Sequence, residues 1–143
     1  MDVVVPINYV AVLVAAVAAI VLGYLWFGPL FGKHWMKLAG LNKPSSMDAA
    51  AKQAMMKSYA LMSLGSLVMA YVLAHSLIFA SAYTQTTGLS AGLMVGVWNW
   101  LGIVAPVKMG DQLWNGKPWM LFAIEAGYYL VSLCMMGVIL AMM

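Results

Sequence analysis

The stretch Ile7–Phe27, INYVAVLVAAVAAIVLGYLWF, decides the fold. It contains no charged side chain over about twenty residues, which is the length of helix that crosses a hydrocarbon core of about 30 Å. Tyr24 and Trp26 lie near its end, where amphipathic aromatic rings favour the boundary between membrane and water. We therefore predict a transmembrane helix, which Pro29 and Gly32 end.

Three further hydrophobic runs follow, at about residues 58–79, 89–107 and 119–142. They are long and unbroken, without the alternating apolar and polar pattern of a membrane β-barrel. The composition is 65% hydrophobic and 8% charged, whereas about a quarter of the residues in a soluble domain are charged. The sequence therefore predicts an all-α integral membrane protein, a single domain over residues 1–143 that forms a four-transmembrane-helix bundle.

The second helix is expected to begin before it enters the membrane. Pro44, Ser45 and Ser46 form a start signal, with a serine as the predicted N-cap. Asp48 then falls in the first turn, where the helix dipole favours an anion. We expect this helix to start in water near residue 46 and to reach lipid near residue 58.

The lysines indicate the orientation. Cytoplasmic loops of membrane proteins collect lysine and arginine. The N-terminus, the loop 81–88 and the C-terminus carry neither residue. All seven lysines lie in the first and third loops, at Lys33, Lys37, Lys43, Lys52, Lys57, Lys108 and Lys117. We therefore predict a protein of the cell (inner) membrane with both termini outside and the first and third loops in the cytoplasm.

The first loop has its own pattern. Phe31, Trp35 and Leu38 are spaced four and three residues apart, and Lys33 and Lys37 fall on another face of the same helix. This pattern is typical of a short interfacial helix lying among the lipid headgroups. An ordinary connecting loop is the alternative.

Small residues repeat every four positions within the spans. In a membrane such rows let helices approach closely. They do not reveal whether the neighbour is in the same chain or in a second subunit, but four short spans bury little surface, so we predict a homo-oligomer. The predicted packing residues are Ala11, Ala15, Ala19 and Gly23 in the first span, Ser66, Ala70 and Ala74 in the second, Gly88, Gly92 and Gly96 in the third, and Ala123 and Gly127 in the fourth.

Glu125 is the only acidic residue inside a predicted span. It lies roughly 9 Å from the cytoplasmic end of its helix. Lys108 ends the third span on the same side, so we expect a Glu125–Lys108 ion pair within or between chains, or a protonated Glu125 that is hydrogen-bonded to its neighbours. A site coupled to protons or cations is the functional alternative, because ionisable groups in membranes are often functional.

Two other polar positions lie inside the spans. His75 is the only histidine in a span, and helix rise places it about 16 Å in depth from Glu125, too far for direct contact. A hydrogen bond to another helix is expected for His75, with a haem, metal or proton-handling role as the alternative. Asn99, beside Trp98, is expected to bond to another helix or to contact a substrate.

Several function classes find no support in the sequence. It contains no serine-hydrolase, zinc-protease, phosphate-loop or dinucleotide motif, so an enzyme is not predicted. The single cysteine, Cys134, forms no metal or redox pair, and the fourteen methionines form no copper-binding cluster on an outer loop. No metal site or cofactor is identified, and the lysines do not form the basic stripe of a nucleic-acid-binding protein.

Two main functions remain. The first is a small oligomeric transporter or channel-like protein, with His75, Trp98, Asn99 and Glu125 lining its path. The alternative is an accessory or scaffold protein of the membrane, in which these polar residues only hold helices together. A haem- or metal-binding membrane protein with His75 as a ligand is a third, weaker hypothesis. The bilayer is the expected partner, and the sequence identifies no substrate or ion.

Longer motifs connect the chain to a family. They are Asn8-Tyr9, the segment 26–33 (WFGPLFGK) with Trp35, the segment 100–102 (WLG), the segment 113–119 (LWNGKPW) and the segment 126–130 (AGYYL). This pattern resembles a small bacterial membrane family, domain-of-unknown-function family 1761. The resemblance runs from Asn8 to about Ala141. It implies a four-span bacterial membrane protein, and it supplies no activity and no catalytic residues.

Overall fold

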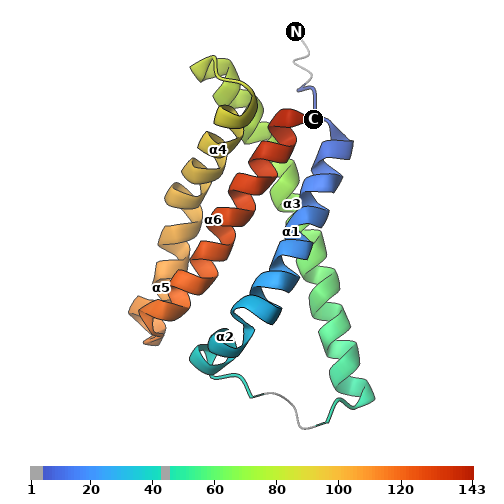
Figure 1. Cartoon of the computed structure of the whole chain (residues 1–143), viewed down its shortest axis with the longest axis vertical. Helices are drawn as coiled ribbons and strands as arrows, with labels where there is room; N and C mark the ends of the chain where they lie inside the picture. Colours follow the sequence, from blue (N-terminus) through green and yellow to red (C-terminus); the bar gives the residue numbers. More distant parts are fainter. Residues whose placement is uncertain (1–4, 43–45) are drawn as a thin grey trace.

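The computed structural model describes residues 5–42 and 46–143, and most of them are helical (Figure 1). Within these ranges no strand occurs, which confirms the predicted all-α class. Four helical segments are long and apolar enough to cross a membrane: Tyr9–Leu30, Ala49–Thr84, Gly88–Asn115 and Trp119–Met142.

The first span ends between the two residues that are predicted to break it. Helix α1 (Tyr9–Leu25) passes directly into a π-helical turn, η1 (Trp26–Leu30), which contains Pro29. The helical segment thus ends at Leu30, between Pro29 and Gly32, and Pro29 lies inside its last turn. The wider turn is closed by the Phe31 N–H, which donates to the Trp26 carbonyl at 2.8 Å. This bond spans five residues, so the ring of Pro29 and its missing N–H are accommodated.

A short helix, α2 (Gly32–Ala39), follows η1 and confirms the helix predicted in the first loop. A Cβ atom at its first residue would lie 2.5 Å from the Phe27 carbonyl oxygen, so only glycine fits between η1 and α2. Lys33 and Lys37 are exposed, whereas Trp35 is half-buried against the bundle.

Helix α3 (Ala49–Thr84) is the longest element, and its 36 residues give a length of about 54 Å. The predicted serine N-cap is wrong: Asp48 is the cap, and its carboxylate accepts the Ala51 N–H at 2.7 Å. A carboxylate satisfies a free N–H at a helix start and also faces the positive end of the dipole. Lys43, Pro44 and Ser45 lie outside the described residues.

The third span consists of α4 (Gly88–Asn99), a second π-helical turn η2 (Trp100–Val104), and α5 (Ala105–Asn115). Pro106 has no N–H for the carbonyl four residues earlier, and its ring would clash with that carbonyl in a regular α-helix. The π turn lies just before this proline, so the chain remains helical through Pro106.

The fourth span is α6 (Trp119–Met142), which lies beside α4 along its length (Figure 1). Glycines allow this contact: a Cβ atom on Gly92 would lie 2.5 Å from the Gly137 carbonyl oxygen, and one on Gly96 would lie 2.7 Å from the Cys134 Cα. Gly88, also predicted in this row, has no neighbour within 4 Å of its Cβ position and begins α4 with a φ of 64°.

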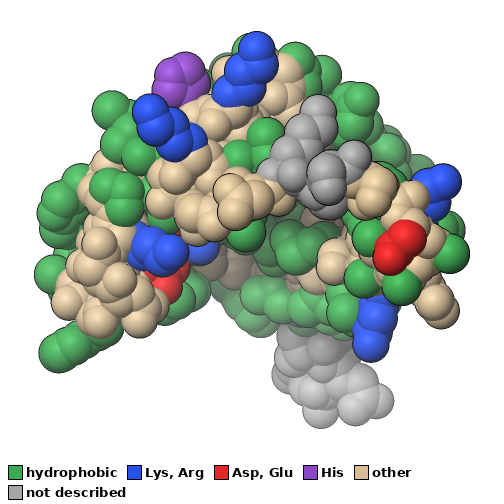
Figure 2. Space-filling view, turned by 90° about the horizontal axis from the view of Figure 1, so that it is seen from below, with side chains coloured by type: hydrophobic (Ala, Val, Ile, Leu, Met, Phe, Trp, Pro, Cys, Tyr) green, Lys and Arg blue, Asp and Glu red, His purple; other side chains and the backbone are tan. Residues whose placement is uncertain are grey.

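The two ends of the molecule differ in composition. At one end the termini meet, since the Asn8 side chain donates to the Met143 carbonyl at 3.2 Å. The buried core lies toward this end and uses small residues, including Ala15, Ala19 and Ala70. Lysine side chains surround the opposite end, where a hollow backed by hydrophobic side chains is visible (Figure 2).

Candidate functional site

A cavity of about 820 Å³ lies in the lysine-bearing half of the molecule. Its walls come from α1, η1, α2, α3, α5 and α6, and much of its lining is aromatic. It also contains one acidic and one basic side chain, Glu125 and Lys108. The aromatic lining residues are Tyr24, Phe27, Trp35, Tyr59, Tyr128 and Tyr129, and Ser63 and Ser66 add hydroxyl groups from α3.

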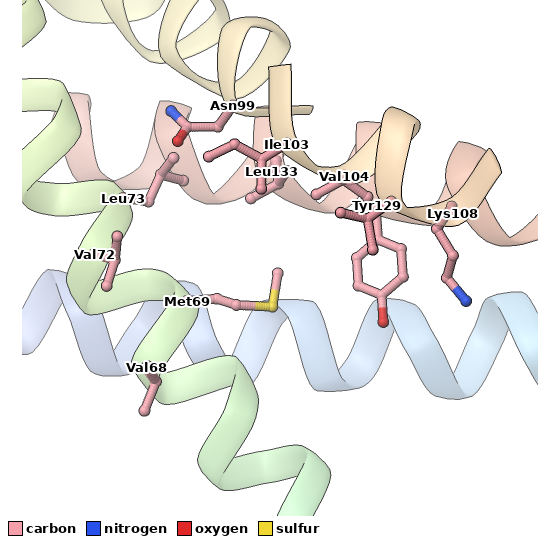
Figure 3. A pocket seen from close by; sticks show the side chains of 11 residues that line it. Val68, Met69, Val72, Leu73, Asn99, Ile103, Val104, Lys108, Tyr129 and Leu133 are labelled. Atoms are coloured by element: carbon pink, nitrogen blue, oxygen red, sulfur yellow. The ribbon is translucent and has the colours of Figure 1, made fainter. Parts of the chain in front are cut away.

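A second cavity of about 400 Å³ lies between α3, α6 and the helix pair η2–α5. Its lining is apolar apart from Asn99, Lys108 and Tyr129. Figure 3 shows Asn99 at one end, with the Tyr129 hydroxyl and the Lys108 ammonium together at the other. Lys108 and Tyr129 line both cavities, so they form the boundary between them.

An ion pair stands at this boundary. The Lys108 Nζ donates to Glu125 Oε2 at 2.7 Å, and the Trp35 indole N–H donates to the other carboxylate oxygen at 3.0 Å. The Glu125 side chain is only 18% exposed. Lys108 also lies 3.7 Å from Asp111 Oδ2, one turn further along α5. The structure thus brings the two predicted residues together within one chain.

Three tryptophans fix the segment of α6 that carries Glu125. Each donates its indole N–H to one of three consecutive residues, and two of these donors begin the π-helical turns. Because the donors come from η1, α2 and η2, they hold α6 in one rotational position while its backbone remains helical. The bonds are Trp26 to the Ile124 carbonyl (3.0 Å), Trp35 to Glu125 Oε1, and Trp100 to the Ala126 carbonyl (2.7 Å).

Tyr128 closes one side of the larger cavity. Its hydroxyl is buried and donates to the Ala19 carbonyl at 3.0 Å. Gly23 leaves room for this contact, because a Cβ atom there would lie 3.1 Å from the hydroxyl oxygen. The ring also packs edge-on against Phe27 at 5.1 Å between centroids. This interaction joins α1 to α6 beside the ion pair.

The other predicted site residues lie elsewhere. His75 and Asn99 do not form the predicted bonds to other helices: their side chains bond to the Tyr71 and Val95 carbonyls of their own helices, at 2.9 and 2.8 Å. A carbonyl four residues earlier satisfies the polar group without a partner helix. Asn99 lines the smaller cavity, whereas His75 and Trp98 line neither, and Trp98 is 65% exposed.

No group of three or more histidine, cysteine, aspartate or glutamate residues is placed to hold a metal ion within residues 5–42 and 46–143. The sequence interpretation missed the three tryptophan donors, Tyr128 and Tyr129 as parts of the site. A signal for them was present, since Trp26, Trp35, Trp100, Tyr128 and Tyr129 all lie in the motifs that carry the family resemblance.

The comparisons with known proteins give one result. The family model described as "Protein of unknown function (DUF1761)" matches residues 10–141. No curated protein and no solved structure matches the chain. The matched region includes the ion pair, all three tryptophan donors and both cavities. Because the match covers nearly all of its length, the chain belongs to the protein family of unknown function DUF1761.

Proposed function

We propose that this protein binds a small amphipathic molecule in the larger cavity and carries it across the membrane. The observation that supports this most strongly is the ion pair Lys108–Glu125, whose two partners come from spanning segments and face a cavity of about 820 Å³. Small-molecule sites have volumes of about 300–1,000 Å³ and combine apolar walls with a few polar groups. Charged groups are costly in a membrane and mark functional sites by default.

The shape of α3 supplies a route into the cavity. Its side chains Tyr59, Met62, Ser63 and Ser66 form one wall. Figure 1 shows the first half of α3 diverging from α1 toward the lysine-bearing end. Every residue of α3 from Lys52 to Met62 is exposed. A ligand could therefore enter beside this half of α3 without breaking the packed core.

Filling the cavity tests the proposal. Ser63→Phe places a ring in the cavity, whereas Leu64→Phe adds the same ring at a neighbouring position that lines neither cavity. Binding of Nile red, a neutral amphipathic dye, is measured in nanodiscs by energy transfer from the protein's tryptophans. We expect Ser63→Phe to weaken saturable binding at least tenfold and Leu64→Phe to leave it unchanged. Equal binding by both variants and the unmodified protein would refute the cavity as the site.

We also propose that the lysine-bearing end faces the cytoplasm and that the termini face outward. The support is the distribution of all seven lysines over the first and third loops. In a Cys134→Ala background, a cysteine at Tyr83 should react with a membrane-impermeant maleimide in cells whose inner membrane is intact. A cysteine at Lys117 should react only after lysis. The reverse pattern would invert the proposed topology.

We further propose a homo-oligomer. In the hydrophobic windows of the four spans, only 28% to 39% of the residues are buried within one chain, which leaves a large surface for a second copy. Mass measurement in nanodiscs tests this proposal. A monomer would refute the oligomer and would leave the cavity proposal intact, because all the lining residues belong to one chain.

A further inference from the structure

We infer that the ligand is an organic ammonium ion with an apolar or aromatic body, and that it replaces Lys108 as the partner of Glu125. This inference rests on the proposed function, since it names the class of molecule that the larger cavity takes. It depends on the charges around the ion pair and on the side chains that line the cavity.

Lys108 has a second carboxylate within reach. Its Nζ is 2.7 Å from Glu125 Oε2 and 3.7 Å from Asp111 Oδ2. Asp111 lies one turn away on the same helix, and its side chain is 44% exposed, at the edge of the site. If a cation binds Glu125, Lys108 can move fully to Asp111. Both positive charges then have a carboxylate, and no charge in the membrane is left without a partner.

An anionic ligand would instead leave a carboxylate without a positively charged partner. It would take Lys108 away from Glu125, whose carboxylate would keep only the Trp35 N–H. Among the described residues that line the two cavities, Lys108 is the only lysine, so no second cation can replace it. An unpaired carboxylate within a span is costly. The arrangement of one lysine between two carboxylates therefore favours a cation.

The aromatic lining favours the same class. Six aromatic side chains face the larger cavity, and Glu125 lies among them. The face of an aromatic ring attracts ammonium groups, and the attraction is stronger where water is excluded. Quaternary ammonium groups are characteristic ligands of such aromatic sites. A neutral molecule could fill the same volume, but it would gain nothing from the exchangeable ion pair.

Two permanently charged probes of similar size test the inference. Benzyltrimethylammonium is the cation and phenylmethanesulfonate is the anion. Radiolabelled forms are equilibrated by dialysis with the protein in nanodiscs, and dissociation constants are measured. We expect the cation to bind and the sulfonate to show no saturable binding. Glu125→Gln should weaken cation binding more than tenfold, because the amide carries no charge.

Two substitutions on α5 decide whether Lys108 competes with the ligand. Lys108→Met removes the competitor and should tighten cation binding severalfold. Asp111→Asn removes the alternative partner of Lys108, so it should weaken cation binding about threefold. Asp111 is partly exposed, so this variant keeps the test decisive even if Lys108→Met does not fold. Unchanged affinity in Asp111→Asn, or weaker affinity in a folded Lys108→Met variant, would overturn the exchange.

The outcomes separate this inference from the proposed function. Saturable sulfonate binding that Lys108→Met abolishes would overturn the cation and leave cavity binding standing. Nile red binding that Ser63→Phe blocks, without binding of either ion, would also overturn only the ligand class. If neither the ions nor Nile red bind, both proposals fail. Uptake of the cation into proteoliposomes that is lost in Glu125→Gln would support both the proposed function and the ligand class. Binding without uptake would refute transport alone.

Discussion

The two halves of the bundle are held together by different means. Near the termini, the backbones of α4 and α6 meet directly at Gly92 and Gly137, and small side chains fill the core around them. Near the lysines, α6 is held by indole N–H groups that reach from Trp26, Trp35 and Trp100. The contact between α4 and α6 leaves no room for a side chain between their backbones, whereas the lysine-bearing half borders a cavity of about 820 Å³.

This difference shows how one small bundle can combine close contact between helices in one half with a cavity in the other. Direct backbone contact excludes space between helices, since even one methyl group would collide there. A tryptophan side chain instead reaches across several ångströms and fixes its partner by a directed hydrogen bond. The lysine-bearing half can therefore keep α6 in place without closing around it. Substitutions in the two halves should differ accordingly in their effects.

The largest effect is expected in the closed half. Gly92→Val would place its Cβ 2.5 Å from the Gly137 carbonyl oxygen, a collision with backbone that only separation of α4 and α6 can relieve. Because overpacking of this kind costs about 3 kcal/mol or more, we expect a sharp fall in melting temperature or failure to fold. The measurement is thermal unfolding in detergent.

Gly65→Val is the matched control for this substitution. Gly65 also lies within a helix, α3, but a Cβ atom there meets nothing within 4 Å. Its melting temperature should stay close to that of the unmodified protein. If both variants unfold alike, the effect reflects loss of glycine from a helix and not the contact between α4 and α6.

The next largest effect is expected at the ion pair. Lys108→Met leaves the Glu125 carboxylate with only its bond from Trp35, which should lower the free energy of unfolding by about 1–3 kcal/mol. Replacing both partners by methionine should restore part of this loss, because no charge is then left unpaired. Titration with SDS measures both variants. A double variant that is less stable than Lys108→Met alone would contradict this account.

The sequence predicts one half of the molecule better than the other. Regular four-residue spacing reveals Gly92 and Gly96 as close-contact positions, although it does not identify the residues of α6 that they contact, Gly137 and Cys134. The Lys108–Glu125 contact follows from depth alone, because both lie near the same membrane surface. These features depend on helix period and rise, which can be counted along a sequence.

The hydrogen bonds of the tryptophans could not be predicted from helix period and rise. Trp26 and Trp100 each begin a π-helical turn, and one extra residue in a turn rotates all that follows by about 100° relative to a regular helix. The path from η1 into α2, and with it the position of Trp35, therefore depends on a local irregularity that hydrophobic periodicity does not show. The sequence places Trp35 on an interfacial helix, but its bond to Glu125 depends on the three-dimensional path of η1 and α2.

A smaller effect is expected when one tryptophan donor is removed. Trp100→Phe keeps the ring but loses the bond to the Ala126 carbonyl, which should cost about 1 kcal/mol. Trp98→Phe is the control, since Trp98 lies on the same span and is mostly exposed. Melting temperatures of the two variants check the difference. Equal values would mean that the indole bonds do not hold α6.

The smallest effect, at Leu61, is expected in a comparison between the two halves of a single helix. Leu61, in the first half of α3, is 58% exposed, whereas Leu73, in the second half, is 2% exposed and belongs to the core. In a membrane both side chains remain in apolar surroundings, so the cost of truncation reflects lost packing and not transfer to water. Leu73→Ala should lower the free energy of unfolding by about 2–3 kcal/mol. Leu61→Ala should change it by less than about 0.5 kcal/mol.

A loss at Leu61 as large as that at Leu73 would mean that the first half of α3 packs against the bundle, which would close the route into the cavity.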